Sequence, residues 1–183
     1  MAKLLSKQDY ERRIETSKWV LTFIAIMTIF NVFLLGILGD EDYFISSSAI
    51  TVHIVSIGKI FTGNMDNDFY VGKWADIQFL SGEFLYGMMA IGIVVGLLFL
   101  LAGILTKKRI GFTILGTILV LVDTVCMFFV YEFDFMFYCD LAIHIAMIVI
   151  CSLAIDAHMK LKRFAEQEQA LIKSFRHDHR LYK

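Results

Sequence analysis

Long apolar runs dominate the hydrophobic pattern of this chain. Three runs, 19–38, 84–105 and 110–130, are almost entirely apolar, and a fourth, 135–155, contains two ionisable side chains. Each reaches the length of about 20 residues that an α-helix needs to cross a hydrocarbon core of about 30 Å. Inside lipid a segment must satisfy its own backbone hydrogen bonds, so we predict four transmembrane helices.

The composition supports this prediction and excludes a water-soluble fold. Hydrophobic residues make up 58% of the 183 residues and the mean hydropathy is +0.68. A soluble domain of this size could not hide so much apolar surface. Proline is absent, which is typical of uninterrupted helices. The three cysteines, Cys126, Cys139 and Cys151, form no C-x-x-C motif, and we interpret them as free thiols packed among helices.

The positive charges are distributed unevenly. Of the 17 Lys and Arg residues, 15 lie before the first span, in the link at 107–109, or after the fourth span. Because cytoplasmic segments carry an excess of Lys and Arg, this pattern predicts that both ends of the chain are cytoplasmic. The net charge of −1 gives no indication of nucleic-acid binding.

The segment 43–62 is too short and polar for an ordinary span. Ile50, Ile54, Ile57 and Phe61 recur at helical spacing, with hydroxyl and lysine side chains between them. We expect an extracytoplasmic amphipathic helix that lies on the outer membrane surface. A short helix that dips into the bundle is the alternative.

The residues after the fourth span, 157–183, keep a helical stripe of apolar side chains among bases. They either extend the fourth helix into the cytoplasm or lie on anionic lipid. The whole chain, 1–183, is therefore predicted to be one domain: an all-α, four-transmembrane-helix bundle with an outer amphipathic segment and a cytoplasmic tail.

Ionisable side chains inside the predicted spans point to a polar cluster. Asp123 and His144 are equally distant from the turn between the third and fourth spans, so they should meet on adjacent helices. Asp140 lies one helical turn before His144 on the same face. Asn31 reaches a similar depth in the first span, and His53 could join if its segment dips inward.

Three interpretations of this cluster are open. It is a structural network that locks helix packing, a relay for protons or cations, or a divalent metal site, since Asp and His are suitable ligands. No H-E-x-x-H pattern supports a metal, and we assign neither a metal nor a cofactor. The chain also lacks G-x-S-x-G, a P-loop and a dinucleotide fingerprint, so we assign no catalytic residue and expect no enzyme.

Gly92 and Gly96 form a G-x-x-x-G pattern in the second span. Such a pattern lets helix backbones approach closely. We expect these glycines to pack within the bundle rather than to form a dimer.

Four short stretches carry a recognisable pattern: Asp42–Ala49, Lys107-Lys108-Arg109, Val122-Asp123-Thr124, and Asp140 with His144. Together they resemble a family of small, uncharacterised multi-pass membrane proteins of Gram-positive bacteria. The resemblance implies a bacterial cytoplasmic membrane and marks Asp123, Asp140 and His144 for testing. This sequence departs from that pattern at Thr51-Val52, where the family has a proline.

Two functional classes follow from the sequence. The first is a non-enzymatic accessory, regulatory or interaction subunit that works through helix contacts in the bilayer, with another membrane protein or a second copy of the chain as partner. The second is a small proton or cation transporter or channel that uses the Asp/His cluster. The absence of nucleotide motifs and of proline-broken helices favours the first.

Overall fold

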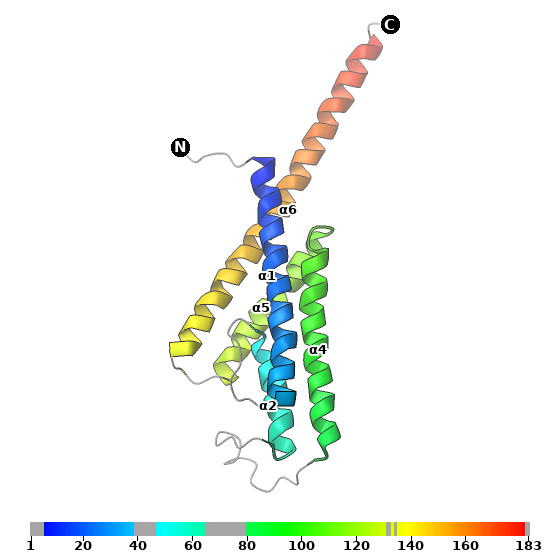
Figure 1. The fold of residues 1–183 in the computed structure, drawn as a ribbon. Coiled ribbons are helices and arrows are strands. Elements are labelled where there is room, and N and C mark those ends of the chain that lie inside the picture. The colour runs from blue at the N-terminus through cyan, green and yellow to red at the C-terminus, as the bar shows by residue number, and fades with distance from the viewer. Residues whose placement is uncertain (1–5, 39–46, 65–79, 131–132, 134, 182–183) are drawn as a thin grey trace.

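The computed structural model describes residues 6–38, 47–64, 80–130, 133 and 135–181. In this part of the chain every regular element is a helix, and none is a strand. Figure 1 shows the arrangement. In chain order the helices are α1 (Lys7–Phe33), its π-helical extension η1 (Leu34–Leu38), α2 (Ala49–Phe61), α4 (Gly82–Leu105), α5 (Ile110–Val130) and α6 (Phe135–Leu181).

Four of the described helices are long and apolar enough to cross a membrane, namely α1 with η1, α4, α5 and α6. They contain the four runs predicted from the sequence, so the all-α, four-helix membrane fold is confirmed. The start of α1 and the far end of α6 lie at the same end of the bundle (Figure 1). The three cysteines are all free, as predicted.

The main core is formed where α1 packs against α4 and α6, with α5 closing the bundle. Leu21, Ile24 and Ala25 of α1 meet side chains from each of the other long helices. Many large apolar side chains on the other helix faces are exposed, as a surface solvated by lipid requires.

Gly92 and Gly96 of α4 pack inside the bundle, as expected. Gly92 and Gly96 are both buried. A Cβ at Gly92 would lie 2.9 Å from the Cγ2 atoms of both Thr51 and Val32, and one at Gly96 would lie 2.7 Å from Ile29 Cγ1. Gly92 therefore allows α4 to approach α1 and α2 at the same point.

Helix α2 enters the bundle, so the expectation that segment 43–62 lies on the membrane surface was wrong for its described part, 47–62. Its 13 residues span about 20 Å, too short to cross a bilayer core. They pack between the second half of α1 and the first half of α4, and against α5. Residues 43–46 lie outside the described part.

Helix α2 enters the bundle because its small and polar side chains, rather than its isoleucines, face the other helices. Thr51, Val55, Gly58 and Lys59 are buried, whereas the isoleucines of the predicted apolar face are only half-buried. In lipid, small residues face other helices because they allow the helices to approach closely.

Helix α6 continues without a break beyond the bundle. Its 47 residues correspond to a length of about 70 Å. From residue 162 to residue 173 every side chain is exposed, although the ring of Phe164 still lies 6.0 Å from that of Tyr10 at the start of α1. Of the two alternatives for residues 157–183, extension of the fourth helix is the one observed as far as Leu181.

The close packing at Gly92 predicts the effect of one added methyl group. Gly92→Ala should lower the free energy of unfolding by about 1–3 kcal/mol, because the two methyl groups that it meets belong to stiff β-branched side chains on two other helices. Thermal unfolding of the detergent-purified protein measures the change.

Gly87→Ala provides the matched control. This glycine lies in the same helix and has nothing within 4 Å of an added Cβ. Its substitution should leave the unfolding temperature unchanged or raise it slightly, since alanine favours a helix over glycine. Equal losses in the two variants would contradict the packing described above.

Candidate functional site

Asp123 is the centre of the polar cluster inside the bundle. It lies on α5, is 1% exposed, accepts three hydrogen bonds from α2 and its N-cap, and forms a fourth with His144. Its Oδ1 accepts from the hydroxyl of Ser48 at 2.7 Å and from the backbone N–H of Ile50 at 3.0 Å. Its Oδ2 accepts from the backbone N–H of Ala49 at 3.1 Å and lies 3.1 Å from Nε2 of His144. These donors suit an ionised carboxylate, which has lone pairs for all of them.

Asp123 thereby caps the first turn of α2. The first N–H groups of a helix have no partner within the helix, and the helix dipole places partial positive charge at that end. Four successive N–H groups, from Ser48 to Thr51, are all satisfied by side chains. Ser48 donates to Thr28 Oγ1 at 2.9 Å, Ala49 and Ile50 donate to Asp123, and Thr51 donates to Ser48 Oγ at 3.4 Å.

His144 connects Asp123 to Asp140. Its Nδ1 lies 3.0 Å from the backbone carbonyl oxygen of Asp140 and 3.4 Å from the carboxylate of the same residue. A carbonyl oxygen can only accept, so Nδ1 donates, and one proton is shared between Nε2 and Asp123. The structure therefore brings Asp123, Asp140 and His144 into one hydrogen-bonded chain, as their positions in the sequence predict.

Asn31 lies in the same region and is connected to Asp123 only through the residues that precede α2. It is fully buried in α1, and its Nδ2 donates to Ser47 Oγ at 2.6 Å. With Thr28, which accepts from Ser48 N–H, it fixes the two residues that precede α2. The first span thus positions the end of α2 that Asp123 caps.

His53 lies four residues beyond Ala49 on α2 and is half-buried. The groups that donate to Asp123 come from Ser48, Ala49, Ile50 and His144, so His53 is not one of these donors. The structure places it on the inserted helix, as the alternative placement of segment 43–62 requires, but about one helical turn away from the cap.

Ser47, Ser48 and Thr28 are the members of the network that reasoning from the sequence did not assign to the cluster. The serine run before α2 indicates a helix cap, and Ser48 is indeed its N-cap residue. No local signal shows that this cap donates to a carboxylate 75 residues further along the chain.

The contacts of this cluster are hydrogen bonds. Both ring nitrogens of His144 face oxygen atoms of the two aspartates, at 3.0–3.4 Å. Across the described residues, no three His, Cys, Asp or Glu side chains form a group that could hold a metal ion. Those aspartates therefore hold the imidazole in a fixed orientation.

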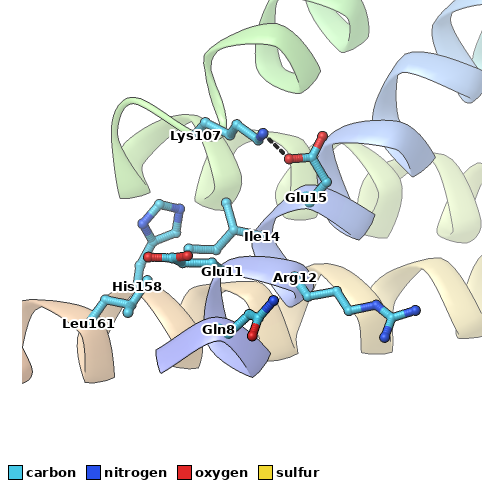
Figure 2. Close-up of a pocket in the computed structure, with 8 residues that line it drawn as sticks. All are labelled: Gln8, Glu11, Arg12, Ile14, Glu15, Lys107, His158 and Leu161. Carbon is cyan, nitrogen blue, oxygen red and sulfur yellow. Dashed lines mark ion pairs between the residues drawn. The ribbon is translucent and has the colours of Figure 1, made fainter. Parts of the chain in front are cut away.

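A separate hollow of about 730 Å³ lies at the end of the bundle where α1 begins (Figure 2). Acidic and basic side chains share its wall, and Lys107 forms an ion pair with Glu15 across it. This pair joins the short link between α4 and α5 to α1. The hollow has no net excess of either charge, since its lining contains Glu11 and Glu15 as well as Arg12 and Lys107.

Comparison with known protein families, with curated protein sequences and with solved structures finds no match to this chain. The four apolar helices define the class of the molecule, an α-helical protein of membrane type.

The cap on α2 predicts a large cost for removing the charge of Asp123. Asp123→Asn replaces one acceptor oxygen by an NH₂ group that faces existing donors, so it should lower the free energy of unfolding by about 3–5 kcal/mol, the usual cost of breaking a buried pair. Thermal unfolding in detergent, followed by size-exclusion chromatography, measures the loss.

Asp156→Asn is the matched control, because Asp156 lies on α6 outside this network and is only half-buried. It should unfold close to the wild-type temperature. A wild-type unfolding temperature for Asp123→Asn would show that the carboxylate does not stabilise α2.

Proposed function

We propose that this chain is a multi-pass protein of a bacterial cytoplasmic membrane, with both ends in the cytoplasm, and that it acts without catalysis as an accessory or regulatory subunit. The resemblance to small membrane proteins of Gram-positive bacteria supports the choice of membrane. The excess of bases before α1, in the α4–α5 link and after the span of α6 supports the orientation, since all three segments belong to one end of the bundle.

The observation that supports the proposed role is that the buried ionisable groups bind to one another and to the start of α2. Both carboxylate oxygens of Asp123 form hydrogen bonds with the first turn of α2 or with His144. Both ring nitrogens of His144 form hydrogen bonds with the two aspartates. Charged groups inside a bundle usually mark a transport path or a structural pairing. Here each contact fixes the position of a helix, which favours the structural alternative.

A partner protein would then bind to surfaces outside the core. The lipid-facing sides of α4 and α5 expose many large apolar residues, and the extension of α6 exposes Leu171 and Ile172 beyond the bundle. Contacts of this kind suit a second membrane protein or a second copy of this chain. Nothing in the charge distribution favours nucleic acid as a partner.

A transporter of protons or cations is the competing proposal. The observation that favours it is the series Asp123–His144–Asp140, in which groups that exchange protons lie 3.1 Å and 3.4 Å apart inside the bundle. The two proposals differ in whether this series changes its protonation during function.

The proposed orientation predicts the labelling of engineered cysteines in intact cells. In a background in which the three native cysteines are replaced by alanine, Asn64→Cys should react with a membrane-impermeant maleimide from outside. Asn64 is exposed and follows the last residue of α2 by three positions, and α2 ends opposite the bases (Figure 1). Glu168→Cys, exposed on the α6 extension, should react only after permeabilisation. The reverse pattern would refute the orientation.

Liposomes test the role. Purified wild-type protein, reconstituted with a pH-sensitive dye inside, should dissipate an imposed proton gradient no faster than liposomes without protein, because the His144 protons are committed to fixed partners. Gramicidin serves as the positive control, and size-exclusion chromatography confirms that the protein is folded. A proton or potassium flux that His144→Ala abolishes would contradict the accessory role and establish transport.

A further inference from the structure

A second hollow, of about 300 Å³, lies between α1 and α6 at the end of the bundle where the bases gather. Its wall combines two chemistries. Two arginines and a hydroxyl come from the first turns of α1, and two aliphatic side chains come from the last part of the α6 span. The lining residues are Asp9, Arg12, Arg13, Thr16, Ile150 and Leu153.

The two arginines are available to a ligand. Arg12 is exposed and Arg13 half-buried, and neither forms an ion pair within the part of the chain that the structure describes. Arg13 lies 5.8 Å above the ring of Tyr10, which orients its guanidinium. Arg12 lines both hollows, and Figure 2 shows its guanidinium pointing away from His158.

The acidic member of this wall is already engaged. Asp9 accepts from both the backbone N–H and the hydroxyl of Ser6, each at 2.8 Å, and so completes the capping box of α1. The hydroxyl of Thr16 donates to the carbonyl oxygen of Arg12 at 3.0 Å, which leaves its lone pairs available. The hollow thus offers two free guanidinium donors and one hydroxyl acceptor.

The depth of these groups matches the boundary of a bilayer. Trp19, 60% exposed, lies six residues deeper than Arg13 on α1, about 9 Å along the helix. Exposed tryptophan is typical of the membrane–water interface. At the level of Thr16, Ser17 contacts Cys151 on α6, so Ile150 and Leu153 lie where acyl chains begin.

We propose that this hollow binds one anionic phospholipid with a glycerol-type headgroup. Arg12 and Arg13 hold the phosphodiester through charge-assisted hydrogen bonds, for which the fork of a guanidinium is well suited. The Thr16 oxygen accepts from a headgroup hydroxyl, and the first methylenes of an acyl chain lie on Ile150 and Leu153. Basic pockets between transmembrane helices suit such headgroups. The site requires only that the chain is embedded in a bilayer and is independent of its role as an accessory subunit.

Native mass spectrometry of the full-length protein in a neutral detergent tests the site. With added phosphatidylglycerol the protein should retain one lipid per chain, and with phosphatidylcholine none. Arg12→Ala/Arg13→Ala should weaken phosphatidylglycerol binding about 30-fold, since each base near an anionic headgroup contributes about fivefold. Arg12→Lys/Arg13→Lys keeps the positive charge but removes the paired guanidinium donors, so it should show a smaller loss of binding. It replaces the alanine variant in this test if that variant fails to fold.

Lys162→Ala/Arg163→Ala is the matched control. It removes the same charge from exposed positions of α6 outside the hollow and should leave binding unchanged. An equal loss in this control would overturn the site in favour of diffuse attraction. Equal retention of phosphatidylcholine would also overturn it. So would displacement of the lipid by glycerol phosphate at similar concentrations, because the ligand would then be a free phosphate ester.

Discussion

The architecture depends on one interaction, the capping of α2 by Asp123 in the interior of the bundle. A helix that ends in water can leave its first N–H groups to the solvent, but α2 begins among apolar helices where no water is available. Each unsatisfied group there would cost several kcal/mol. Asp123, Ser48 and Thr28 together satisfy four successive N–H groups, and the negative charge of Asp123 complements the helix dipole.

The remaining polar residues of the core follow from this constraint. A buried carboxylate needs a compensating partner, and His144 supplies it from the neighbouring helix at 3.1 Å. The imidazole in turn is held by Asp140, one turn away on its own helix. Asn31 fixes the residues that lead into α2. The cluster is thus a single hydrogen-bond network through which α1, α5 and α6 all fix the beginning of α2.

Much of this could be predicted from the sequence, because membrane helices obey simple rules of length and register. The four spans follow from the thickness of the bilayer, and the pairing of Asp123 with His144 follows from their equal distance from one turn. The position of α2 could not be predicted, because its periodicity is the same for a surface helix and an inserted one. Thr51 and Gly58 favour the inserted position because they pack closely against α4, which lies far from them in the sequence. The hydrogen bond from Ser48 to Asp123 is likewise invisible in local sequence.

The two ends of α1 show how one helix serves two kinds of environment. In its second half, uncharged polar side chains such as Thr28 and Asn31 are fully buried and make hydrogen bonds within the protein. In its first turns, charged side chains lie at the membrane boundary, where some pair with other elements, as Glu15 does with Lys107. Arg12 and Arg13 differ because the capping box already engages Asp9, the acid beside them. A positive charge that the protein leaves uncompensated at the level of the headgroups is best compensated by the lipid itself, and for this reason the arginines mark a lipid site rather than a second structural network.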